Sequence, residues 1–116
     1  MCARAGASEK RLAELERELE LFIKRGARPV ARQGESFIIA YALRLLGVKV
    51  KLGVKQGRYR IRLPYSERKK ALEALKRGGV REAVAKAYRM YLLWSRFLRA
   101  RGVTLLEYFN SLCGAL

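Results

Sequence analysis

The stretch Val48–Leu63, VKVKLGVKQGRYRIRL, constrains the fold more than any other part of the chain. Apolar residues alternate with Lys and Arg on both sides of Gln56-Gly57. Alternation with a period of two is typical of a strand that has one buried face and one solvated face. The sequence therefore predicts an antiparallel β-hairpin over residues 48–63, closed by a two-residue loop. Because an isolated hairpin is marginal in water, other elements must cover it.

The position of the loop fixes which residues face one another across the hairpin. One face is expected to be apolar, and the other to carry positive side chains with one glycine among them. The expected pairs are Val54–Tyr59, Leu52–Ile61 and Val50–Leu63 on the apolar face, and Lys51–Arg62, Gly53–Arg60 and Lys55–Arg58 on the other.

The second of these faces is called the basic face below, and repulsion among its positive side chains opposes formation of the hairpin. Like charges directly opposite each other across a ladder destabilise it by roughly a few tenths of a kcal/mol per pair. A polyanion laid across the face turns this repulsion into attraction, so the face predicts a nucleic-acid interface. Protection of edge strands against aggregation is the alternative explanation. The residues of the basic face are Lys49, Lys51, Lys55, Arg58, Arg60 and Arg62.

The charge of the chain is strongly one-sided, with a formal net charge of +16. Residues 1–20 contain five Glu and four Lys or Arg, whereas the remainder contains five Glu and twenty-two Lys or Arg. Such a field favours association with nucleic acid or another anionic surface. The abundance of Arg, Lys and Glu with little Asn and Gln resembles the composition of hyperthermophile proteins. A composition of this kind explains why charged residues are numerous, but it does not explain why positive residues outnumber negative ones.

Catalytic chemistry has few candidate residues here, because the chain contains no His and no Asp. The usual general base and the commonest metal ligand are therefore missing, and we expect no enzymatic activity, metal or cofactor. An enzyme that acts on an anionic substrate would have to use Glu35, Glu67 or Glu107. Cys2 and Cys113 have no CxxC spacing and predict neither a disulfide framework nor a zinc site, although a bridge between them stays open.

An intracellular, cytoplasmic location is expected. The first residues lack the apolar run of a signal peptide, and lone cysteines fit a reducing compartment. The longest apolar stretch, residues 37–46, contains Arg44 and is too short to cross a bilayer. We therefore expect no membrane association.

The rest of the chain is predicted to be helical, which gives a mostly helical α+β fold in a single domain, residues 1–116. Residues 1–7 are expected to be frayed and 26–34 to be a connector that carries Arg28 and Arg32. Ser8 and Ser66 are predicted N-caps, and Thr104 and Glu107 form a predicted capping box. The hairpin lies between helix pairs, and the expected helices span residues 8–25, 35–46, 66–77, 80–101 and 104–113.

The apolar pattern of these helices predicts which faces are buried. Helix 8–25 has a seam with 3-4-3 spacing, Leu12, Leu15, Leu19 and Phe22, which packs either on the chain's own core or on a second copy. Helix 35–46 is apolar almost all round and should be central. Helix 66–77 should turn inward the residues Ala71, Leu72 and Leu75. The aromatic stripe Tyr88, Tyr91 and Trp94 is interpreted as core and not as a base-stacking surface.

Part of the chain resembles a known DNA-binding family. An apolar helix (Ile38–Gly47), a hairpin that ends in GRYRIRL (Gly57–Leu63) and a following helix (Ser66–Arg77) look like half of a LAGLIDADG-type domain. In that family the hairpin strands lie in the DNA groove, and an acid at the end of the first helix binds the catalytic metal. No acid stands at Leu46-Gly47-Val48, so the resemblance implies groove binding without cleavage.

These observations together predict a non-catalytic nucleic-acid-binding protein. The basic face would contact the phosphate backbone with help from Arg28, Arg32, Lys69 and Lys70. A two-stranded ribbon fits the DNA major groove, but it could equally brace structured RNA. The alternative is a structural subunit of a ribonucleoprotein or a nucleic-acid-coating shell, with helix 8–25 contacting a second copy or another protein.

Overall fold

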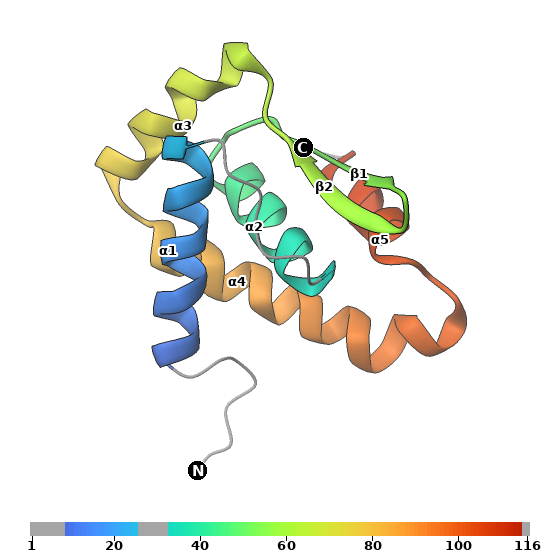
Figure 1. Ribbon diagram of the computed structural model, residues 1–116. Coiled ribbons are helices and arrows are strands. Elements are labelled where there is room, and N and C mark those ends of the chain that lie inside the picture. Colours follow the sequence, from blue (N-terminus) through green and yellow to red (C-terminus); the bar gives the residue numbers. More distant parts are fainter. Residues whose placement is uncertain (1–8, 26–32, 115–116) are drawn as a thin grey trace.

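A computed structural model of the protein describes residues 9–25 and 33–114. Within these residues the chain forms five α-helices and one two-stranded antiparallel sheet, which confirms the predicted α+β, mostly helical fold (Figure 1). The predicted frayed stretch 1–7, which includes Cys2, and the residues Ser8, Arg28 and Arg32 lie outside the described residues. The elements in chain order are α1 (Glu9–Arg25), α2 (Gln33–Leu45), β1 (Lys51–Lys55), β2 (Arg58–Arg62), α3 (Tyr65–Arg77), α4 (Val80–Leu93) and α5 (Leu105–Cys113).

Helix α2 is the centre of the molecule, as its all-round apolar sequence predicted. Every residue from Glu35 to Leu43 is buried, and the helix contacts α1, α4, α5 and both strands. Figure 1 shows α1 on one side of α2 and the hairpin on the other. The helix begins at Gln33, so the last two residues of the predicted connector are helical. Gly34 lets α2 lie close to Tyr91 of α4, because a Cβ there would be 2.8 Å from the Tyr91 ring.

Helix α1 buries its apolar seam inside the chain itself. Leu15 and Leu19 are completely buried, and Leu12 and Phe22 are nearly so. The helix packs on α2, α3 and α4, so the seam is not left exposed for a second copy. A partner of α1, if there is one, would have to contact its outer, polar face.

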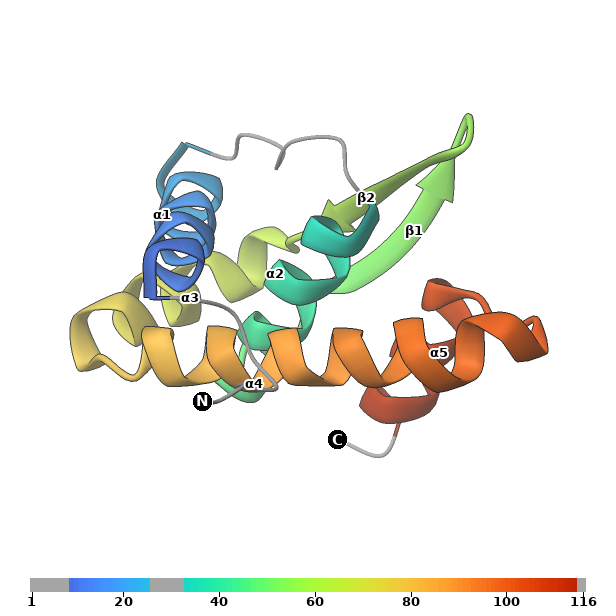
Figure 2. The same cartoon turned by 90° about the horizontal axis from the view of Figure 1, so that it is seen from below.

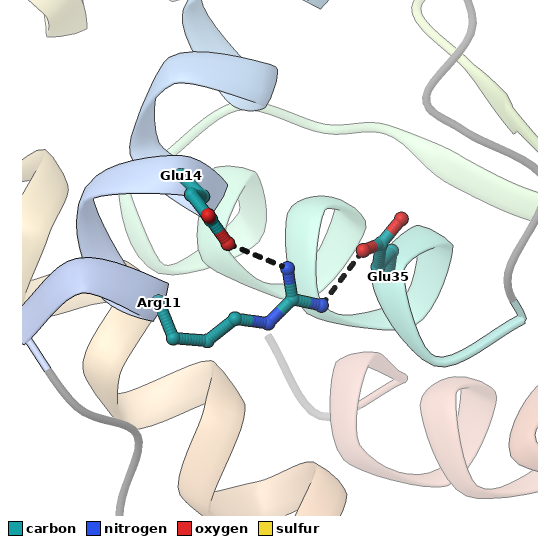
Figure 3. Close-up of polar contacts among 3 residues, drawn as sticks. All are labelled: Arg11, Glu14 and Glu35. Carbon is teal, nitrogen blue, oxygen red and sulfur yellow. Dashed lines mark hydrogen bonds and ion pairs between the residues drawn. The ribbon is translucent and has the colours of Figure 1, made fainter.

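Ion pairs also hold α1 in place. The Arg11 guanidinium donates 2.7 Å to Glu35 Oε2 of α2 and 3.3 Å to Glu14 Oε1 (Figure 3). Arg81 of α4 donates to Glu16 at 2.7 Å and to Glu9 at 2.9 Å. Ion pairs thus join α1 to α2 through Arg11 and to α4 through Arg81.

Helix α3 differs from its prediction at two points. Its N-cap is Pro64 and not Ser66, and no side chain caps it. Pro64 has an extended backbone (φ −59°, ψ 146°), and its carbonyl accepts from the Glu67 N–H at 2.9 Å, so the helix starts directly after it. Leu72 is exposed where it was expected inside, whereas Ala71 and Ala74 are buried. The inner face is therefore formed by small residues, which let α3 approach its neighbours closely.

Helix α4 continues through a π-helical turn (Trp94–Leu98) and a 3-10 turn (Arg99–Arg101), so the predicted helix 80–101 is helical throughout but not α-helical throughout. The aromatic stripe packs on the core as predicted: Trp94 is buried, and its Nε1–H donates 2.7 Å to the Val103 carbonyl. The predicted capping box at Thr104 and Glu107 is present at the start of α5. One hydrophobic core includes buried residues from all five helices and both strands.

Candidate nucleic-acid interface

The hairpin has the register that the sequence predicted. β1 and β2 pair as Lys51–Arg62, Leu52–Ile61, Gly53–Arg60, Val54–Tyr59 and Lys55–Arg58. Val50 and Leu63 lie just outside this ladder. Gln56 and Gly57 form the loop with φ angles of 53° and 76°. Two positive φ angles are what a type I′ turn requires, and this turn matches the twist of paired strands.

The apolar face of the hairpin is covered at its base and uncovered at its tip. Leu52 and Ile61 are buried under α2 and α5, so α5 shares the covering role that was expected of the preceding helix alone. Tyr59 is half-buried, and Val54 is 48% exposed. In Figure 2 the turn of the hairpin extends beyond the helices. The tip is therefore the part of the sheet that is free to enter a groove.

The basic face is open to solvent along its length. Five of its six cationic residues are exposed, and Arg60 is half-buried. None of the six forms an ion pair with any acid in the part of the chain that the structure describes. Three acids of α1, Glu9, Glu14 and Glu16, pair with Arg11 or Arg81 instead. The positive charge of the hairpin is thus left uncompensated where it is most concentrated.

Two polar contacts fix the base of the hairpin on the helices. Arg44 Nε of α2 donates 2.9 Å to the Val50 carbonyl. The Lys49 N–H donates 2.9 Å to Glu67 Oε1 of α3, and Lys70 Nζ lies 3.5 Å from Glu67 Oε2. The bond from the Lys49 backbone, helped by the charge of Lys70, holds the pKa of the Glu67 carboxyl below its usual value. The direction of the hairpin is therefore set by both α2 and α3.

A hollow opens in the middle of the basic face. It has a volume of about 530 Å³ and is lined by Gly53, Val54, Lys55, Arg60, Ile61 and Arg62. Lys55, Arg60 and Arg62 are cations of the basic face, and Gly53 is the glycine on that face. Val54 and Ile61 belong to the apolar face and are their neighbours in the strands. The hollow lies where the missing side chain of Gly53 faces Arg60, so the face is notched and not flat.

The other predicted contact residues are placed less closely together. Lys70 is brought to the base of the hairpin by Glu67, as described above. Lys69 is exposed on α3, but no contact in the described structure joins it to the hairpin. Arg28 and Arg32 lie outside the described residues, so their predicted role stays a prediction.

The three acids considered for catalysis each have a structural partner. Glu35 binds Arg11, and Glu67 binds the Lys49 N–H. Glu107 accepts from the backbone N–H and the hydroxyl of Thr104, and these bonds hold its pKa below the usual value. A general acid at neutral pH needs a raised pKa, the opposite of what Glu67 and Glu107 show. Across residues 9–25 and 33–114, no three His, Cys, Asp or Glu side chains gather as a metal site would require.

Sequence reasoning missed three features of this surface. Glu67 was considered as a possible catalytic acid, yet its carboxylate anchors the hairpin by accepting from the Lys49 N–H; its spacing from Lys70 was the available signal. The hollow was also missed, although a glycine inside a strand often marks close approach of a ligand. Tyr65, the first residue of α3, is 90% exposed, and nothing in the sequence separated it from the buried aromatic residues.

Comparisons with other proteins add nothing to this geometry. No helix in the described residues is long and apolar enough to cross a membrane. The resemblance to a LAGLIDADG-type domain stays an expectation from patterning. No model of a known protein family matches the chain, and no curated protein or solved structure matches it either.

Proposed function

We propose that the protein binds nucleic acid without catalysing a reaction on it, and that the basic face of the hairpin is the binding surface. The observation that carries this proposal is the row of five cations on the two-stranded ribbon, with Lys49 just before it, none of the six paired with an acid side chain in the described residues. A phosphate backbone supplies a matching row of anions, and its condensed counterions are released when Lys and Arg neutralise it.

The anchoring of the hairpin supports this role. Arg44 and Glu67 hold its base, and α2 and α5 cover its buried side chains. A ribbon that is already ordered in the free protein loses little conformational entropy when it binds. Such contacts position the protein on its ligand but carry little sequence information directly. We therefore propose a binding mode that depends on shape and charge.

Double-stranded DNA is the ligand that fits the ribbon best. The major groove of B-DNA, about 12 Å wide, admits a two-stranded β-ribbon, whereas the deep and narrow major groove of A-form RNA does not. The uncovered tip around Val54 extends beyond the helices and has room to enter such a groove. Structured RNA, bound through its backbone, is the competing ligand and belongs in the same experiment.

The test is a salt series of binding measurements by fluorescence anisotropy on labelled double-stranded DNA, double-stranded RNA and single-stranded RNA. A variant with Lys51, Arg60 and Arg62 changed to Gln is compared with the unchanged protein. If each residue contacts a DNA phosphate, the slope of log K against log salt should flatten by about 2–3 units. Unchanged affinity and slope in the variant would refute the proposal and leave edge protection as the reason for these charges.

A matched control removes the same amount of charge elsewhere. Lys10, Arg17 and Lys24 are exposed on α1, on the other side of α2 from the hairpin (Figure 1). Changing these three to Gln should leave the slope within about one unit of the original. Equal losses in both variants would mean that net charge alone drives binding, without a defined face.

A structural subunit of a nucleoprotein assembly is the second candidate. The observation that favours it is an exposed apolar pair: Leu93, the last residue of α4, is 47% exposed, and Phe97, in the π-helical turn that follows, is 60% exposed. Light scattering of the protein with and without DNA distinguishes the two: a monomer that stays at one copy per short duplex argues against assembly. We also propose a cytoplasmic location, supported by Cys113, a buried cysteine with a free thiol.

A further inference from the structure

We propose that the hollow in the basic face binds one backbone phosphate of the nucleic acid, and that residue 53 is a glycine because a side chain there would fill this phosphate seat. This inference rests on the proposed function and deepens it, because it names the chemical group that the hairpin holds. The phosphate seat includes an uncharged residue, Gly53, which the pattern of Lys and Arg alone does not indicate.

The fold gives no reason for a glycine at position 53. Gly53 lies in the middle of β1, directly opposite Arg60, and a glycine inside a strand weakens the strand. Its φ angle is not among the positive ones, which an ordinary residue would resist. A Cβ built there would meet no heavy atom within 4 Å. Any small side chain would therefore fit the backbone and the space.

What the glycine does provide is room. The open volume of about 530 Å³ beside it is bordered by the cationic residues Lys55, Arg60 and Arg62. A glycine inside a strand often marks a place where a ligand approaches the backbone closely. A tetrahedral anion placed over Gly53 would therefore be surrounded by positive side chains on the same face of the ladder.

Arg60 supplies the second, independent observation. Its Nε is buried, exposing less than 1 Å² to solvent, and has no hydrogen-bond partner in the described structure. Buried polar groups are nearly always paired, so this side chain has a donor to satisfy. A phosphate in the hollow would be an acceptor once the guanidinium turns toward it, and the resulting bonds are charge-assisted. The bound state thus completes what the free protein leaves unpaired.

The experiment fills the hollow without changing the charge. Gly53→Ala and Gly53→Val are compared with the unchanged protein for binding to the same labelled DNA duplex. Losing one charge-assisted contact should weaken binding about tenfold or more for Gly53→Val, and less for Gly53→Ala. Urea unfolding of both variants should show stability equal to or above that of the original, because side chains fit this strand better than glycine.

A control adds bulk at an exposed position away from the hairpin. Ala13 on α1 is exposed, and Ala13→Val should leave the affinity for DNA unchanged. A spectroscopic readout addresses Arg60 directly: its Nε–H signal in a proton–nitrogen NMR spectrum should shift when the duplex is added, and should shift much less in Gly53→Val. That signal reports the contact even where other residues keep the affinity high.

The outcomes separate this inference from the function on which it rests. If the hairpin charge variant loses DNA binding while Gly53→Val binds normally, the interface stands and the phosphate seat is refuted. If Gly53→Ala and Gly53→Val are both markedly less stable, the glycine serves the backbone and the inference is equally refuted. If the unchanged protein binds none of the nucleic acids, both proposals fail together. Weak binding by a stable Gly53→Val supports the seat.

Discussion

At the scale of single residues, Glu67 links the hairpin to the helical part of the chain. Its carboxylate accepts from the backbone of Lys49, before β1, while the residue itself stands in the first turn of α3, after β2. The side chain therefore ties together the two ends of the hairpin. Because it takes an N–H that no other described group accepts, the contact favours the ionised carboxylate over the acid.

The pH dependence of stability should reveal this contact. The folded pKa of Glu67 lies below its ordinary value of 4.5, so its contribution is complete above pH 4.5 and is lost as the pH falls through the folded pKa. Glu67→Gln keeps the shape but not the charge, so the variant should be less stable at pH 7. In urea titrations the difference in stability between the two proteins should shrink as the pH falls from 7 to below the ordinary value of 4.5. A gap that stays constant over this range would contradict the prediction.

At the scale of elements, the order of apolar and polar residues predicted most of the helices and both strands, because the residues that define each element lie close together in the sequence. The alternation of the hairpin fixed its register, and the capping box fixed the start of α5. The start of α3 was predicted wrongly because Pro64, which also ends the hairpin, took the cap position from Ser66. The π-helical turn after Leu93 has no signal in the residue pattern; it accompanies the bond from the Trp94 Nε1–H to the Val103 carbonyl, which depends on how the chain turns after the helix.

The capping box offers a test at this scale. Thr104 Oγ1 accepts from the Glu107 N–H at 3.1 Å, and the Glu107 carboxylate accepts from the Thr104 N–H at 2.9 Å. Thr104→Ala should lower the free energy of unfolding by about 1 kcal/mol, measured by urea titration. Thr104→Ser keeps the hydroxyl and should stay close to the original. If both substitutions cost the same, the methyl group and not the cap would be responsible.

The candidate site was predictable in its charge and not in its shape. The alternation of Lys and Arg with apolar residues is sufficient to predict the basic face. The hollow at Gly53 depends on the arrangement of the residues that line it and on the absence of any neighbour within 4 Å of a Cβ at position 53. Both are properties of packing in three dimensions, which a residue pattern does not specify.

At the scale of the whole molecule, a net charge of +16 on 116 residues opposes compaction through self-repulsion. Raising the salt from about 0.01 M to 0.15 M shortens the Debye length from roughly 30 Å to 8 Å. The melting temperature should therefore rise with salt over this range, as followed by circular dichroism. A melting temperature that falls instead would show that the ion pairs of α1 outweigh the repulsion.

The hairpin should account for part of that rise. The variant with Lys51, Arg60 and Arg62 changed to Gln relieves like-charge contacts worth about 0.5 kcal/mol. It should melt roughly 2–4 °C higher than the original at low salt and gain less from added salt. The control variant at Lys10, Arg17 and Lys24 should show no such increase at low salt, because the acids of α1 surround those residues.

The contact between Arg81 and Glu9 joins residues 72 apart in the chain, and this separation has a consequence for synthesis. Helix α1 leaves the ribosome well before α4, the helix on which it packs. At about 5–20 residues per second the delay is roughly 4–14 s. During that time the seam of Leu12, Leu15, Leu19 and Phe22 is without its final cover. The five glutamates of residues 1–20 should help to keep the nascent helix soluble until α4 has been synthesised.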